Sequence, residues 1–167
     1  MKRVDVNALT PEIFKIFSEN NALLTAGDKA DCNTMTIGWA NFGTLWELPT
    51  CTVYVRPERY TYEFLERHEY FTVSVLRAED RKTAQICGTK SGRDCDKIAE
   101  CGLTLAYGEG DAPYFEESEL VVVCRKLFYQ DIDVSKVTDP RVTMFYTGSM
   151  GSDHRVYIGE VVEAYIK

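Results

Sequence analysis

The segment PTCTVYVRPERYTYEFL, residues 49–65, carries the pattern on which the fold assignment depends. Thr50–Arg56 alternates and is rich in β-branched residues, which predicts a strand. Pro57 has no N–H group to donate and therefore ends the ladder. Thr61–Arg67 then predicts a short helix with Thr61 as its N-cap. The segment indicates a strand that passes directly into a short helix.

Segments of the same two kinds recur along the chain. Further strands are predicted at Leu23–Ala26, within residues 32–43, and at Phe71–Leu76, Leu103–Ala106, Glu119–Tyr129 and Arg155–Ile166. Further short helices are predicted at Thr10–Glu19, Asp80–Cys87, Asp94–Cys101 and near Pro140–Tyr146. Strands that do not alternate with long helices disfavour a doubly wound parallel sheet and favour a closed or partly closed antiparallel barrel. Because 167 residues contain no internal repeat or linker, we expect a single domain over residues 1–167.

The composition excludes some classes of partner. The chain has 19 Lys and Arg against 26 Asp and Glu, a net charge of −7, which argues against a general binder of nucleic acid or of anionic membranes. Its longest apolar runs, such as Leu120–Cys124, are too short to span a bilayer, and no secretory signal is visible, so the cytoplasm is the predicted location. The six cysteines form no CxxC motif and only two histidines occur, so we predict free thiols and no metal site.

Arg56 and Arg59 stand on either side of Pro57, just before the predicted helix. Free N–H groups and the dipole at a helix N-terminus favour an anion, Thr61 adds a hydroxyl, and guanidinium groups can donate to a phosphate in pairs. The alternative is an ordinary turn with solvated arginines. These residues alone leave both interpretations open.

A second cationic segment is GTKSGRD, residues 88–94, with two glycines and the donors Thr89, Lys90, Ser91 and Arg93. It lacks the GxxxxGK[ST] pattern of a P-loop. The alternative is that Lys90 and Arg93 only favour the C-terminal end of the preceding helix electrostatically. By itself this segment is a weak indication of an anion site.

Two other segments suit a flat, mostly apolar cofactor and a reaction beside it. Asn33–Glu47 contains both tryptophans with polar neighbours, although Trp46 is better explained as a core or interface residue. His154 follows Asp153 and a loop rich in Gly and Ser, and an acid can orient such a histidine near an active site. A structural or solvated histidine is the alternative.

Five segments together resemble the flavin reductase-like family of FMN-binding split-barrel proteins, in particular its flavoredoxin-like branch. In order, they are NTMTIGWANFG, PTCTVYVRPERYTYEFL, FTVSVL, CGTKSGRDCDKIAECGL and DHRVYIGEVV. The resemblance implies a mainly β fold: a six-stranded antiparallel Greek-key split barrel with short peripheral helices. It also implies a homodimer with FMN near the subunit interface.

The resemblance further implies which residues hold FMN. The segment expected to touch the flavin ring and its edge contains Asn33, Met35, Thr36 and Trp39. The strand whose backbone is expected to meet the ring contains Cys51, Thr52, Val53 and Tyr54. Part of the phosphate and ribityl clamp is expected at Arg56, Tyr60 and Thr61, and a second anion-binding turn at Gly88, Thr89, Lys90 and Ser91, with Lys90 preferred over Arg93. His154 is expected near the place where a substrate stacks over the flavin, as the candidate catalytic residue that positions a donor or acceptor.

The function implied by this resemblance is that of an FMN-binding oxidoreductase. Electrons pass from NADH, NADPH or a redox protein through bound FMN to flavin or another acceptor. Use of a nicotinamide is inferred, because the chain has no GxGxxG fingerprint. Two alternatives stay open: a non-enzymatic FMN electron carrier between protein partners, and a flavin-binding module without turnover. The expected partners are a small molecule or a redox protein.

Overall fold

The computed structural model describes residues 17, 22–77, 79–147 and 153–167. Its largest element is a seven-stranded sheet with the order β2-β1-β5-β8-β9-β4-β3, in which every pairing is antiparallel. The strands are Ala22–Gly27 (β1), Cys32–Ile37 (β2), Ala40–Leu45 (β3), Leu48–Val55 (β4), Tyr70–Val75 (β5), Leu120–Asp131 (β8) and Arg155–Ile166 (β9). Leu105–Tyr107 (β6) and Pro113–Phe115 (β7) form a separate two-stranded sheet.

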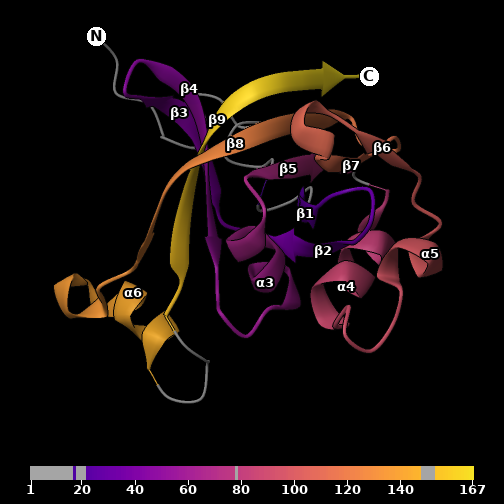
Figure 1. Cartoon of the computed structure of the whole chain (residues 1–167). Coiled ribbons are helices and arrows are strands. Elements are labelled where there is room, and N and C mark those ends of the chain that lie inside the picture. The colour runs from indigo at the N-terminus through magenta and orange to yellow at the C-terminus, as the bar shows by residue number, and fades with distance from the viewer. Residues whose placement is uncertain (1–16, 18–21, 78, 148–152) are drawn as a thin grey trace, which may run out of the picture.

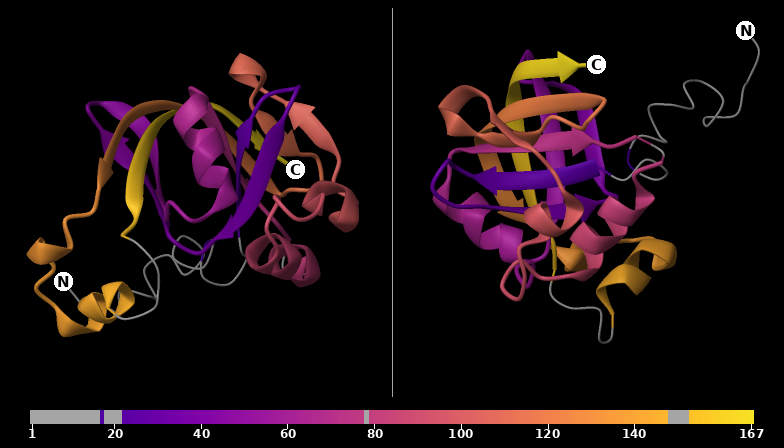
Figure 2. Two further views of the ribbon diagram at one scale, coloured as in Figure 1. Left: turned by 60° about the horizontal axis from the view of Figure 1, so that its bottom comes forward. Right: turned by 90° about the vertical axis from the view of Figure 1, so that its right-hand side faces the viewer.

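The helices of the described residues are short. They are Tyr60–Arg67 (α3), Arg81–Thr89 (α4), Lys97–Cys101 (α5) and Pro140–Thr143 (α6), with 3-10 turns at Glu109–Asp111, Val134–Lys136 and Met144–Tyr146. The large sheet curls, and α3 lies in the opening between its two ends, while α4 and α5 lie together beside β1 and β2 (Figures 1 and 2). Within the described ranges no helix is long and apolar enough to cross a membrane.

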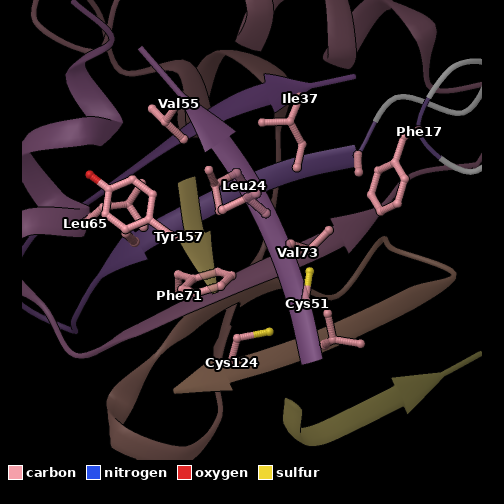
Figure 3. Packing of buried hydrophobic residues seen from close by; sticks show 14 of the residues in the cluster. Phe17, Leu24, Ile37, Cys51, Val55, Leu65, Phe71, Val73, Cys124 and Tyr157 are labelled. Carbon is pink, nitrogen blue, oxygen red and sulfur yellow. The ribbon is translucent and has the colours of Figure 1, made fainter. Parts of the chain in front are cut away.

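The core occupies both faces of strand β1, which lies between β2 and β5. Inside the curled sheet, Leu24 packs with Phe64, Phe71 and Tyr157 in the main cluster (Figure 3). On the outer face, Leu23 packs with a smaller cluster under α4 and α5. Because β1 is buried on both sides, its sequence ALLTAG is mostly apolar and does not alternate; the hydroxyl of its one polar residue, Thr25, donates to Thr34 Oγ1 at 3.0 Å.

The predicted fold class, a mainly β antiparallel split barrel with short peripheral helices, is confirmed. The expected count of six strands differs from the seven of the large sheet, because residues 32–43 hold two strands that separate at Gly38. β2 pairs with β1 and β3 pairs with β4. The short strand β7 was not predicted.

One prediction of local structure is wrong, and another lies mostly outside the described residues. Thr61 is not the N-cap of α3, which begins at Tyr60 with Arg59 in the cap position. Thr61 is instead buried in the first turn, where its hydroxyl accepts a hydrogen bond from Asn33. The helix predicted at Thr10–Glu19 lies outside the described residues except for Phe17, which is buried in the main core.

Candidate functional site

Two adjoining hollows lie along β2, one next to the start of α3 and the α4–α5 connection and the other next to the end of β4 and the residue before β9. The first, of about 90 Å³, we call the cationic lobe; its lining includes Arg59, Thr61, Lys90, Ser91 and Lys97. The second, of about 180 Å³, we call the aromatic lobe; its lining includes Thr36, Trp39, Tyr54, Arg56 and His154. Met35 and Arg59 line both lobes. The two hollows are therefore neighbouring parts of one depression.

The structure brings most of the candidate residues to this depression. The candidate residues that line the cationic lobe are Asn33, Met35, Tyr60, Thr61, Thr89, Lys90 and Ser91. Those that line the aromatic lobe are Met35, Thr36, Trp39, Tyr54, Arg56 and His154. Gly88 lies at the junction, because its carbonyl oxygen is 3.5 Å from Arg59 Nη1 and a Cβ atom added to it would lie 3.3 Å from Thr36 Cβ. Cys51, Thr52 and Val53 line neither lobe.

Strand β4 explains why only part of the segment 51–54 reaches the depression. Cys51 and Val53 are fully buried and point into the barrel core (Cys51 in Figure 3), whereas Tyr54 lines the aromatic lobe and donates to Asn41 Oδ1 at 2.9 Å. The ladder between β3 and β4 ends at the pair Ala40–Val53. The pairing of β4 with β3 therefore stops before Tyr54.

Lys97, at the start of α5, is a candidate that the sequence analysis missed. Its side chain lines the cationic lobe although the residue is only 4% exposed. Its ammonium group donates to the carbonyl oxygens of Thr34 at 2.5 Å and Cys87 at 3.3 Å, and burial lowers its pKa. None of the ion pairs formed within the described residues involves Lys97. A buried ammonium group with only carbonyl partners favours an anion beside it.

A signal for Lys97 was present in the sequence. Within the helix predicted at Asp94–Cys101, Lys97 is four residues before Cys101 and next to Ile98, both of which pack against the outer cluster. A lysine on the apolar side of a short amphipathic helix is unusual, because lysines are almost never fully buried without a partner.

Lys90 and Arg93 are both engaged by carboxylates. Lys90 Nζ lies 2.5 Å from Glu100 Oε1, and this hydrogen bond raises the pKa of Lys90. Arg93 pairs with Glu63 of α3 and stacks over the ring of Tyr60. Neither is an uncompensated charge of the kind that Lys97 presents.

Thr61 and Asn33 form a buried polar pair at the wall of the cationic lobe. Asn33 Nδ2 donates to Thr61 Oγ1 at 2.7 Å, so the hydroxyl proton of Thr61 is available to another acceptor. Both residues are buried. This arrangement fixes the threonine hydroxyl beside the first N–H groups of α3.

The aromatic lobe surrounds His154 with rings. The centroid of its imidazole lies 4.7 Å from that of Trp39 and 5.7 Å from that of Tyr146. Arg56 donates to the carbonyl oxygen of Phe145 at 2.8 Å and so ties the segment after α6 to the end of β4. Trp39 remains 39% exposed, which leaves apolar ring surface open in the lobe.

Burial, together with the nearby charge of Arg56, lowers the pKa of His154 to about 4. Its Nδ1 atom is buried and has no hydrogen-bond partner among the described residues. The imidazole is therefore neutral at pH 7 and can offer a hydrogen bond without a charge.

This depressed pKa predicts a pH-dependent stability. In the unfolded chain His154 takes up a proton near pH 6.5, whereas in the folded chain it stays neutral to about pH 4. The unfolded state thus binds more protons in this window, and the free energy of unfolding falls as the pH falls from 6.5 to 4. Between pH 7 and pH 4.5 we expect wild type to lose about 1–3 kcal/mol more than His154→Gln. Urea unfolding of both proteins at the two pH values measures this difference; equal losses would contradict it.

A family model described as "Flavin reductase like domain" matches residues 14–167. The chain belongs to the flavin reductase-like family. The resemblance stated from the sequence is confirmed.

The relatives of this chain carry names that describe different redox proteins. A high molecular weight rubredoxin of Moorella thermoacetica is 27% identical over 117 residues, which cover 70% of this chain and 42% of the relative. The chain thus spans less than half of that curated relative. The structure of flavoredoxin from Methanosarcina acetivorans matches with a TM-score of 0.69 and 24% identity, covering 100% of this chain and 76% of the other. An NADH:FAD oxidoreductase of Streptomyces globisporus matches with a TM-score of 0.67 and 18% identity, covering 100% and 88%.

Proposed function

We propose that this protein is an FMN-binding oxidoreductase, with the phosphate of FMN in the cationic lobe and its ring system in the aromatic lobe. The observation that carries the proposal is Lys97, a residue only 4% exposed that lines the cationic lobe and whose ammonium group donates to two carbonyl oxygens. The third N–H of the ammonium group is left for a ligand. A terminal phosphate supplies the anion that this position lacks.

The other donors of the cationic lobe suit the same phosphate. Thr61 can give its hydroxyl proton to a phosphate oxygen, and the first N–H groups of α3 favour an anion. Arg59 lines both lobes, which suits a contact of its guanidinium with the phosphate from the side of the ring. Arg56 lies in the aromatic lobe and is the less suitable of the two arginines.

The aromatic lobe suits a flat ring system with a polar edge. Trp39, Met35 and Tyr54 offer apolar surface, and neutral His154 offers a hydrogen-bonding nitrogen. When bound, FMN supplies the redox chemistry, because it can accept and release electrons. The residues of this chain bind and orient it, and Trp39 and His154 shape the face on which a donor or acceptor stacks.

The source of the electrons separates two forms of the proposal. In the first, NADH or NADPH reduces the bound FMN, and the electrons pass to flavin or another small acceptor. In the second, the protein is a flavoredoxin-like electron carrier between protein partners. The match to a high molecular weight rubredoxin supports the second form, as does the net charge of −7, which suits docking to a basic redox protein.

Assembly as a homodimer and a cytoplasmic location are parts of the same proposal. Large apolar side chains are exposed at Val142, Met144 and Phe145, as expected of a surface that a second subunit covers, and Val142 and Phe145 line a hollow together with Trp39 and Tyr54 of the aromatic lobe. These three side chains lie on α6 and the 3-10 turn after it, which Figure 1 places beyond the end of the barrel.

Absorption spectroscopy of the purified protein tests the proposal. We expect a yellow protein, or one that gains a flavin band when FMN is added. Rapid anaerobic bleaching by NADH or NADPH supports the enzymatic form and identifies the donor. Bleaching only by dithionite, or by a reduced rubredoxin, supports the carrier form. A protein that takes up no FMN at micromolar concentrations contradicts both.

A further inference from the structure

Residues 91–96, which we call the strap, connect α4 to α5 and form part of the wall of the cationic lobe. On the other side of the strap lies a larger hollow of about 380 Å³, which we call the adjoining hollow. Asn33, Tyr60, Gly92 and Lys97 line both spaces. The strap and these side chains therefore separate the cationic lobe from the adjoining hollow.

Gly92 makes this partition tight. A Cβ atom at Gly92 would lie 2.0 Å from Asn33 Oδ1 and 3.1 Å from Tyr60 Cδ1, so only glycine lets the strap approach so closely. Asn33 is itself held by its hydrogen bond to Thr61. The backbone of the strap thus rests directly on the residues that form the cationic lobe.

Arg93 ties the strap to the start of α3. Its guanidinium lies 4.6 Å from the ring centroid of Tyr60, donates to the carbonyl oxygen of Glu58 at 3.3 Å and pairs with the carboxylate of Glu63. All three partners belong to residues 58–63. Other hydrogen bonds, such as Asp94 N to Ser91 O at 3.1 Å, lie within the strap, and the Asp96 side chain caps α5. One side chain therefore links this part of the strap to α3.

We propose that the strap, held by Arg93, makes the flavin site selective for FMN over FAD. The inference rests on the proposed placement of the phosphate in the cationic lobe. FAD carries an adenylate on that phosphate, and the larger space next to the lobe is the adjoining hollow, which shares Asn33, Tyr60, Gly92 and Lys97 with it. Gly92 and the side chains on which it rests stand between the two spaces, so an adenylate would enter the adjoining hollow only with the strap displaced. A mononucleotide ends at the phosphate and leaves the strap in place.

The fold as such does not impose this selectivity, since an NADH:FAD oxidoreductase has a similar structure. The selectivity belongs to a local element, and a single side chain is expected to control it. Because guanidinium is planar, Arg93 can stack on Tyr60 and donate to two acceptors at the same time, which lysine cannot do.

The test compares three flavins in matched variants. Dissociation constants of riboflavin, FMN and FAD are measured by quenching of flavin fluorescence for wild type, Arg93→Ala, Glu63→Gln and the double variant. Arg125→Ala is the control, because Arg125 is 44% exposed and paired with Glu160, as Arg93 is 43% exposed and paired with Glu63. We expect Arg93→Ala to lower the ratio of FMN to FAD affinity about tenfold, because it removes the contacts with Tyr60, Glu58 and Glu63 together. Riboflavin, which has no phosphate, should bind equally to wild type and to Arg93→Ala.

Glu63→Gln should lower the ratio in the same direction by a smaller factor, and the double variant should not exceed Arg93→Ala, because both changes break one contact. An unchanged ratio in Arg93→Ala, or an equal change in Arg125→Ala, overturns the proposal. If Arg93→Ala does not fold, Arg93→Lys replaces it, with a smaller loss of selectivity expected and an unchanged ratio again overturning the proposal. Wild type that binds FMN and FAD equally overturns the selectivity alone, whereas wild type that binds no flavin overturns the proposed function.

Discussion

Replacement of Lys97 by methionine should weaken FMN binding by about 1.5–3 kcal/mol, roughly tenfold to 150-fold, the range for a hydrogen bond to a charged group. Methionine has a similar length and fills the space of the lysine stem, but it carries no charge. The phosphate would lose the buried ammonium group that faces the cationic lobe. Titration of the apoprotein with FMN, followed by flavin absorbance, measures the change.

The stability of the apoprotein separates this effect from misfolding. Without a ligand, Lys97 keeps a charge in a buried position, and the lowering of its pKa reflects that cost. Lys97→Met should therefore leave the free energy of unfolding of the apoprotein unchanged or raise it, while FMN affinity falls.

Lys90→Met is the matched control, because Lys90 also lines the cationic lobe but is exposed and paired with Glu100. Its effect on FMN affinity should be the smaller of the two. If Lys90→Met weakens FMN binding more than Lys97→Met does, the phosphate is held by the turn expected from the sequence and not by α5.

The fold was predictable because its signals are local. Alternation in segments such as FTVSVL, and β-branched residues in CTVYV, mark strands without knowledge of their partners. The sequence did not predict that residues 32–43 belong to two strands, because a glycine within a β-rich run fits a bulge as well as a break. Only the pairing of each half with a different strand decides between them.

The sequence predicts most residues of the candidate site. It does not predict which of the charged side chains are paired with carboxylates. The sequence places Lys90 and Arg93 in one cationic segment, but it does not state that Glu100 and Glu63 meet them. Those pairings depend on how α3, α4 and α5 pack around the barrel. Lys97 illustrates the converse, since its environment of two carbonyl oxygens comes from β2 and α4, 63 and 10 residues away in the chain.

The largest effect on stability is expected at Phe71. Its side chain is fully buried in the main core of the barrel, next to Cys124 in Figure 3. Phe71→Ala should lower the free energy of unfolding by about 3–5 kcal/mol, because the lost ring leaves a cavity that a closed sheet cannot fill by collapse. Urea unfolding of the apoprotein measures the loss. A loss below about 1.5 kcal/mol would mean that the barrel relaxes around the cavity.

The position opposite this ring gives a sharper test of the same packing. A Cβ atom at Gly159 of β9 would lie 2.7 Å from Phe71 Cε1 and 2.9 Å from Cys124 Cβ. Gly159→Ala alone should therefore destabilise the protein by about 1–3 kcal/mol, the cost of overpacking a core. In the Phe71→Ala background the contact with the ring is gone and only the contact with Cys124 Cβ remains, so there Gly159→Ala should cost less than in wild type, helped by the lower conformational entropy of alanine. The double-mutant cycle should give a coupling energy of about 1–3 kcal/mol, whereas additive losses would show that the two residues do not share this space.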